Sequence, residues 1–309
     1  MSKKLSGVLP IVHVPFLSNE DIDLPTLKVE IDWIYSQGAH GLGSGMVSEL
    51  LRLTVEERIT LTKAMVDFTA GRGATFAGVS AESTRQAMVY ARAADQAGCD
   101  AIMAVPPLTT GLPDNAVLDH FRALADGVSV PLIVQDASGY VGKAIPLSIY
   151  IRLLELYGNE KILFKPEASP IGPNLSALRD ASQGKAQIFE GSGGILLIDS
   201  FRRGIAGTMP GVDLLDGIVG IWNALQRRDD RAAYAMYFPV CAIVALQLQA
   251  GLDGFLAIEK HILHKRGIFP NTFRRKPYSW EMDQETAQEV DRLLKLLADC
   301  VCQQKQLGK

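Results

Sequence analysis

Short apolar runs alternate with longer amphipathic segments along the first two thirds of the chain. Each run is too short for a buried helix and is typical of a strand covered on both faces. Eight runs are predicted as strands, at residues 8–15, 41–45, 75–79, 101–105, 132–135, 162–164, 187–189 and 205–208. The segments between them, such as 24–37, 83–97, 114–125 and 146–157, predict helices. The chain therefore repeats a strand-then-helix unit eight times.

Eight such units in succession indicate a (β/α)8 barrel, because a doubly wound sheet would interrupt the alternation at a switch point. The chain after about residue 229 differs, with helical patterns at 231–249, 255–265 and 283–302 and no strand between them. We predict an α/β protein with a TIM barrel over residues 1–226 and a helical extension over residues 227–309 that packs on it.

Composition and charge narrow the function classes. The 309 residues are 48% hydrophobic, and 31 Lys and Arg against 34 Asp and Glu leave a formal net charge of −3. A slightly acidic chain without a Lys/Arg cluster predicts no nucleic-acid and no membrane partner. No run approaches the roughly 18 apolar residues of a membrane helix, the start does not read as a secretory signal, and the four cysteines form no CxxC pair. We expect a cytoplasmic protein without a disulfide framework.

The strongest candidate chemistry lies at the sixth strand, because barrel enzymes carry their sites at the C-terminal ends of strands. Lys165 ends this strand and Glu167 follows two positions later, so the two side chains share a face. A desolvated lysine amine is a nucleophile that forms a Schiff base with a ketone, and Glu167 is placed to move a proton. The alternative is a structural ion pair at a strand end.

The loop after the second strand contains small residues that suit an anion. Gly45, Met46, Val47 and Ser48 would present successive N–H groups at the start of a helix, with the Ser48 hydroxyl as a further donor. Such a nest binds a carboxylate. The same residues also suit an ordinary tight turn.

Candidate substrate contacts follow three further strands. Gln135, at the end of the fifth strand, would face the barrel mouth, and Tyr140 would add a phenol, although the segment also reads as a turn. Gly191 after the seventh strand, and Gly207 and Thr208 at the eighth, would let a ligand approach the backbone.

The histidines predict no metal site. His13 could face the barrel mouth from the first strand. His261 and His264 form a pair at helical spacing with Glu259 before it, and without a third ligand nearby this segment is interpreted as a polar helix face.

These motifs, in this order, resemble the N-acetylneuraminate lyase/dihydrodipicolinate synthase family over almost the whole chain. The resemblance rests on the glycine-rich loop after strand two, the motif at strand five, the lysine of strand six and the glycine-rich end of strand eight. It implies a class I lyase in which Lys165 forms a Schiff base with a 2-keto acid. It also implies a homotetramer or dimer of barrels.

Departures from the family pattern decide between its activities. The Gly-Thr-Thr-Gly-Glu loop of the synthases is Gly-Met-Val-Ser-Glu at residues 45–49. The two relay tyrosines match Gln135 and Leu108, and the arginine that holds a substrate carboxylate matches Tyr140. Dihydrodipicolinate synthase activity is therefore not expected. Residues 135–137, the Ser-Glu pair at 48–49 and the Lys-x-Glu motif are more similar to the L-2-keto-3-deoxyarabonate dehydratase branch.

The hypothesis from sequence is a lyase that dehydrates a 2-keto-3-deoxy sugar acid, with catalytic residues Lys165, Glu167 and Gln135. It requires neither metal nor cofactor, because the iminium is the electron sink. A pyruvate-dependent aldolase ranks second, because Gln135 cannot take the proton of the C4 hydroxyl. A keto-acid-binding sensor without turnover is the third possibility, and the chain length and stereochemistry of the substrate stay open.

Overall fold

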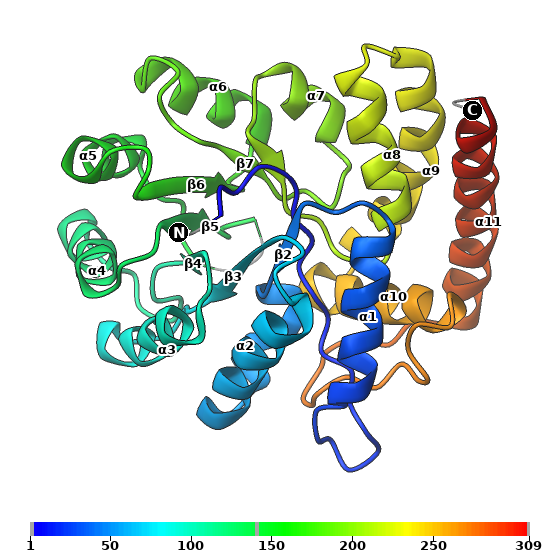
Figure 1. The fold of residues 1–309 in the computed structure, drawn as a ribbon, viewed down its shortest axis with the longest axis horizontal. Coiled ribbons are helices and arrows are strands. Elements are labelled where there is room, and N and C mark those ends of the chain that lie inside the picture. The colour runs from blue at the N-terminus through cyan, green and yellow to red at the C-terminus, as the bar shows by residue number, and fades with distance from the viewer. Residues whose placement is uncertain (1–2, 140–141, 308–309) are drawn as a thin grey trace.

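A computed structural model describes residues 3–139 and 142–307. Eight parallel strands in these residues form the wall of a barrel, and helices surround it (Figure 1). They are β1 (Gly7–Val8), β2 (Gly41–Gly43), β3 (Ala74–Gly78), β4 (Ala101–Ala104), β5 (Leu132–Asp136), β6 (Ile162–Pro166), β7 (Phe189–Glu190) and β8 (Gly207–Thr208). Parallel bridges from Ile11 to Gly43 and from Phe164 to Ile188 join the sheet β1-β8-β7 to the sheet β2-β3-β4-β5-β6. The ladder closes, so the predicted (β/α)8 barrel is confirmed.

A helix follows each strand on the outside of the barrel. These helices are α1 (Leu24–Ser36), α2 (Val55–Thr69), α3 (Thr84–Ala97), α4 (Asp114–Gly127), α5 (Leu147–Tyr157), α6 (Ile171–Ala181), α7 (Leu197–Arg202) and α8 (Leu215–Gln226). After β2 the chain first makes two short 3-10 helices, η1 (Met46–Ser48) and η2 (Leu50–Arg52). Thr54 then caps α2 together with Glu57 in a capping box, which fixes where the loop after β2 ends.

The first strand is shorter than the sequence predicts. Residues 8–15 were expected to form it, but only Gly7–Val8 do, and Ile11 adds isolated bridges to Gly43 and Gly211. Pro10 and Pro15 have no N–H group and cannot donate to a ladder. The rest of the run stays buried, and the Ile11 and Val12 N–H groups still donate to the neighbouring strand segments on either side before the chain reaches the barrel mouth.

Alternation along β5 and β6 decides which side chains reach the interior of the barrel. Ile133 and Leu163 belong to the core inside the barrel, whereas Val134 and Phe164 belong to the core between strands and helices. Two positions further along each strand, the inward direction falls on Gln135 and Lys165. These two residues are direct partners in the register of β5 and β6. The apolar interior layer thus gives way to a polar one near the mouth.

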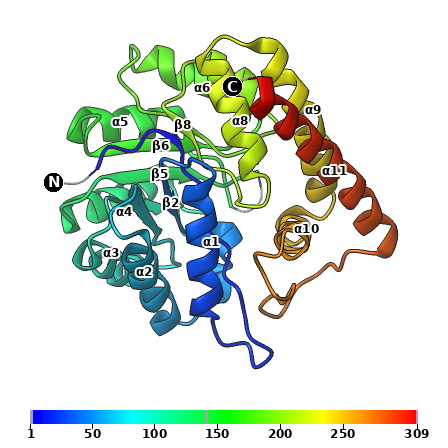
Figure 2. The same cartoon turned by 45° about the vertical axis from the view of Figure 1, so that its right-hand side comes forward.

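Three more helices follow α8 and lie to one side of the barrel (Figure 2). They are α9 (Asp230–Leu248), α10 (Gly251–Lys265) and α11 (Gln284–Leu307). Helix α9 packs against α8, α10 and α11, and α10 also contacts η1. The extension therefore reaches the loop after β2.

Helix α9 is apolar over a longer stretch than was expected of any segment of the sequence. It is the one helix in the described ranges that is long and apolar enough, by length and composition, to cross a membrane. Its Ala233, Met236, Val240 and Ile243 are buried in the core shared by the barrel and the extension. The apolar composition of α9 is therefore explained by its packing in this core.

Candidate active site

Lys165, Glu167 and Gln135 meet at the C-terminal ends of β5 and β6. Lys165 Nζ lies 3.3 Å from Glu167 Oε2, and Gln135 Nε2 donates a 2.7 Å hydrogen bond to the same oxygen. The Glu167 backbone N–H donates to the Asp136 carbonyl, which extends the pairing of the two strands by one residue. Lys165 and Glu167 are each only 4% exposed. The structure therefore brings the three residues together in a buried cluster.

The surroundings of Glu167 favour its protonated form more than water would. Burial raises the pKa of Glu167, and the charge of Lys165 together with the Gln135 hydrogen bond opposes this rise. The nearby Glu190 carboxylate raises the pKa further. A carboxyl whose pKa is raised by burial accepts a proton more readily than an exposed one, which suits general acid–base chemistry.

A cavity of about 40 Å³ lies over this cluster. Its wall is built from strand ends, from η1 and from α10, and includes Ile11, Met46, Val47, Gln135, Lys165, Glu167, Gly191, Gly193, Met209, Pro210, Gly211, Leu252, Phe255 and Glu259. Helix α10 belongs to the extension, so the mouth of the barrel is covered from the side by the C-terminal part of the chain.

The loop after β2 contributes to the cavity wall two residues whose backbone N–H groups are unpaired within the described part of the chain. The N–H groups of Met46 and Val47 have no hydrogen-bond partner among residues 3–139 and 142–307, and both residues line the cavity. Ser48 is placed differently from the expectation. Its hydroxyl donates to the Val12 carbonyl and accepts from the Gly45 N–H, so it holds the loop together and lies outside the cavity wall. The anion-binding capacity of the loop is left to the two N–H groups.

The ends of β7 and β8 contribute differently from what was predicted. Gly191 lines the cavity, but Gly207 and Thr208 form β8 and are not part of the cavity wall, which the chain reaches only at the next residue, Met209. Thr208 Oγ1 donates a 2.6 Å hydrogen bond to Glu190 Oε2. Glu190, which was not predicted as a site residue, is thus held by Thr208, and its charge acts on Glu167. Its position at the end of β7 could have indicated a site residue, because barrel enzymes carry their sites at strand ends.

Tyr140, which was predicted to contact the substrate, lies outside the described residues.

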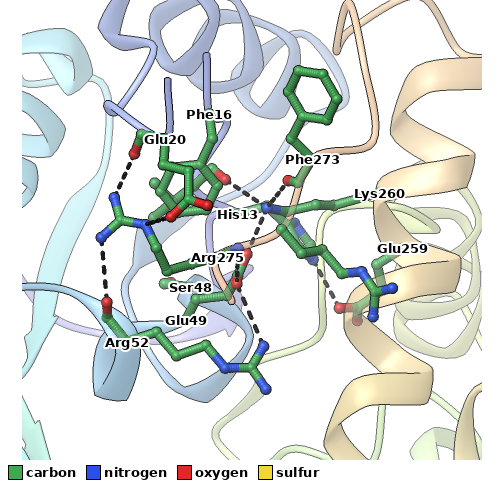
Figure 3. A network of polar contacts seen from close by, with 12 residues as sticks. His13, Phe16, Glu20, Ser48, Glu49, Arg52, Glu259, Lys260, Phe273 and Arg275 are labelled. Atoms are coloured by element: carbon green, nitrogen blue, oxygen red, sulfur yellow. Dashed lines mark hydrogen bonds and ion pairs between the residues drawn. The ribbon is translucent and has the colours of Figure 1, made fainter. Parts of the chain in front are cut away.

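A buried network of charges connects the loop after β2 to α10 (Figure 3). Lys260 of α10 donates to Glu49 Oε1 at 2.5 Å and to the Val14 carbonyl at 2.8 Å, and its ammonium lies 4.5 Å from the centre of the Phe16 ring. Glu49 has a left-handed backbone with φ of 55° between η1 and η2, and its Oε2 accepts from the Arg275 N–H. These contacts clamp the loop that carries the free N–H groups.

His13 lies in the same region, enclosed by two carboxylates. Its Nε2 lies 2.9 Å from Glu259 Oε2, and its Nδ1 lies 3.3 Å from Glu30 Oε1. Burial lowers the pKa of His13, but the two carboxylates outweigh this effect and raise the pKa to about 10. His13 is therefore a cation at neutral pH. Glu259, interpreted from sequence as part of a polar helix face, is 2% exposed and lines the cavity.

Comparison with known proteins agrees with this geometry. The model of the dihydrodipicolinate synthetase family matches residues 4–169, more than half of the chain. The chain belongs to this family. As a member of the dihydrodipicolinate synthetase family it is an enzyme of the lyase and aldolase type, and the resemblance seen in the sequence is confirmed.

Individual relatives in the family carry different names. The chain is 29% identical to L-2-keto-3-deoxyarabonate dehydratase of Azospirillum brasilense over 239 residues, which cover 75% of this chain and 76% of that protein. It is 32% identical to 4-hydroxy-tetrahydrodipicolinate synthase of Leptothrix cholodnii over 134 residues, 43% of this chain and 46% of that one. The solved 4-hydroxy-tetrahydrodipicolinate synthase of Methylacidiphilum fumariolicum SolV has the same fold, with a TM-score of 0.87 at 20% identity, over 98% of this chain and 99% of that chain.

Proposed function

We propose that this protein removes water from a 2-keto-3-deoxy sugar acid through a Schiff base on Lys165. The observation that carries the proposal is the buried contact of Lys165 Nζ with Glu167 Oε2 at the wall of a cavity. Met46 and Val47, whose backbone N–H groups are unpaired among the described residues, line the same cavity, and we assign the substrate carboxylate to these two donors.

The first half of the reaction forms an electron sink. The Lys165 amine, after giving up its proton, attacks the C2 ketone, and loss of water from the resulting carbinolamine leaves an iminium. The positive iminium nitrogen acidifies the C3 protons. Glu167 Oε1 has no hydrogen-bond partner within the described ranges and accepts one of these protons, which leaves an enamine.

The second half expels the C4 hydroxyl. The electron pair of the enamine forms the C3–C4 double bond as the C4–O bond breaks, and the proton held by Glu167 moves to the departing oxygen to form water. Addition of one water molecule to the new iminium frees Lys165 and the dehydrated keto acid. The balance is one substrate to one product and one water, and the raised pKa of Glu167 suits both proton transfers.

The residue at position 135 supports dehydration over carbon–carbon cleavage. Cleavage requires a group that removes the proton of the C4 hydroxyl, and the amide of Gln135 cannot do so at neutral pH. Gln135 instead donates to Glu167 and holds it near Lys165. The relative from Azospirillum brasilense is named for dehydration of such a substrate.

Borohydride reduction in the presence of pyruvate tests the chemistry at Lys165. We expect mass spectrometry to find the reduced adduct on the peptide that contains Lys165, and incubation with a 2-keto-3-deoxy acid to yield a dehydrated keto acid without pyruvate. Pyruvate plus an aldehyde would assign the aldolase instead. An adduct with no turnover on any sugar acid would assign a keto-acid sensor, and no adduct, or one elsewhere, would refute the mechanism.

Two lysines of the same strand region provide a matched pair of variants. Lys165→Arg keeps the charge but cannot form an iminium, and we expect it to abolish the adduct. Lys161, just before β6, donates to the Val128 and Val130 carbonyls, outside the cavity wall. Lys161→Arg should leave the adduct unchanged.

We infer further that the enzyme assembles as a dimer or tetramer of barrels in the cytoplasm, with residues 1–226 as the barrel and residues 227–309 as its extension. Sedimentation velocity measures the assembly directly.

A further inference from the structure

Glu259 is a second carboxylate in the wall of the cavity, separate from the Lys165–Glu167 pair. It comes from α10, whereas Lys165 and Glu167 come from β6 and the residues that follow it. Its neighbours in the wall are the apolar Leu252 and Phe255 of the same helix and Gly211 from the segment after β8.

The two oxygens of Glu259 have different surroundings. Oε2 accepts from His13 Nε2 at 2.9 Å, and His13 is held in turn by Glu30. Oε1 has no hydrogen-bond partner in the part of the chain that the structure describes. It is also not fully buried, because it is absent from the set of fully buried polar atoms that lack a partner. A Cβ on Gly211 would lie 2.5 Å from Oε1, so only glycine at position 211 leaves this oxygen its place. Oε1 is therefore an acceptor open to the cavity.

The charge of His13 holds the Glu259 carboxylate in the orientation that leaves Oε1 open to the cavity. An imidazolium donates from both ring nitrogens, one to each carboxylate. The Nε2–H···Oε2 bond orients the Glu259 carboxylate and offsets the cost of burying its charge. Figure 3 shows the histidine pointing towards Glu259 from the segment after β1. The acceptor is thus fixed before a ligand arrives.

We propose that Glu259 binds a hydroxyl group on the tail of the substrate and excludes keto acids with a negatively charged tail. This proposal rests on the proposed function, since it takes Lys165 as the point at which the keto group is held. A carboxylate oxygen pairs with a hydroxyl donor and repels another carboxylate. The substrate carboxylate is therefore directed to the N–H groups of Met46 and Val47, and the uncharged, hydroxylated tail to α10. The substrate class is a 2-keto acid with a neutral polyhydroxyl tail.

Borohydride trapping at Lys165 tests this with three probes. Pyruvate has no tail, a 2-keto-3-deoxy pentonic or hexonic acid has a hydroxylated tail, and 2-oxoglutarate has an anionic one. We expect the wild-type protein to form adducts at the lowest concentration with the hydroxylated acid and at the highest with 2-oxoglutarate. In Glu259→Gln, the concentration needed for the hydroxylated acid should rise about 10- to 100-fold, the range for a lost hydrogen bond to a charged group. That for 2-oxoglutarate should fall, and that for pyruvate should stay within about twofold.

Glu30→Gln is the matched control, because it removes the other carboxylate from His13 without touching the cavity wall. We expect it to lower stability but to leave the ratio between the three probes unchanged. Equal loss for all three probes in Glu259→Gln, or the same change of ratio in Glu30→Gln, would overturn the proposal. So would an unchanged ratio in folded Glu259→Gln. Failure of the proposed function looks different, because then the wild-type protein itself forms no adduct at Lys165.

Discussion

Adding one methyl group at Gly191 should damage the Lys165–Glu167 pair more than the fold. A Cβ on Gly191 would lie 2.3 Å from Lys165 Cε and 2.3 Å from Glu167 Oε1. Ordinary contacts between such atoms are about 3.5–4.0 Å, so at least one side chain must move by more than an ångström. Gly191 does not have a positive φ, so alanine meets no backbone strain there. The perturbation is therefore purely steric and acts on the two side chains to which the proposed function assigns the chemistry.

The size of the effect follows from this displacement. Misplacing a reacting group by about 1 Å costs on the order of 100-fold in rate, whereas one extra methyl group in a packed region costs about 1–3 kcal/mol of stability. For a chain of 309 residues, that corresponds to a melting temperature lower by roughly 2–5 °C. Gly191→Ala should thus remain folded at room temperature and form the Lys165 adduct about 100-fold more slowly.

The assay is the time course of borohydride-trapped adduct with pyruvate, read by mass spectrometry, alongside a thermal melt. Gly111→Ala is the control, because a Cβ there would meet nothing within 4 Å, and it should behave as the wild-type protein. A folded Gly191→Ala that forms the adduct at the wild-type rate would refute the reasoning.

Three further predictions concern the acid–base group and the buried charges. Glu167→Gln should lower kcat by about 100- to 10,000-fold yet still form the pyruvate adduct; wild-type turnover in steady-state kinetics would rule out Glu167 as the base. The pKa of His13 is raised to about 10 from 6.5, so its stabilisation is complete below pH 6.5 and is lost as the pH rises through 10. Denaturant titrations should show that the free energy of unfolding falls by up to about 5 kcal/mol over that range. His13→Gln should abolish this pH dependence. His120→Asn should keep it, because His120 is a buried histidine whose pKa is lowered to about 4. Lys260→Met should cost up to about 5 kcal/mol, because it removes the buried cation paired with Glu49 Oε1 and leaves only Arg52, 3.5 Å from Oε2; the double variant with Glu49→Gln should recover part of that loss, and additive losses in chemical denaturation would contradict the pairing.

Most of the barrel could be predicted from local patterns in the sequence. The apolar runs that became β3 to β6 could be predicted because a strand buried on both faces needs an almost continuous apolar sequence. The same alternation places Lys165 and Glu167 on one face, so their proximity follows from spacing alone. The first run was overestimated because Pro10 and Pro15 remove donors that a ladder needs.

The second carboxylate of the cavity could not be predicted in this way. Glu259 lies more than ninety positions after Lys165 and has a helical pattern that suits a solvated face equally well. Ser48 illustrates the same limit, since its hydroxyl is taken by the Val12 carbonyl, a partner set by how the first strand passes the loop.

The order of elements and the pairing of Lys165 with Glu167 were determined by the amino-acid sequence itself, because each depends on residues within one strand or one turn. The packing of α10 across the barrel mouth decided which side chains close the cavity. The tertiary structure also decided that His13 is charged, because it places His13 between Glu30 and Glu259. Burial and charge pairing depend on distances between segments far apart in the chain, and no local pattern records those distances.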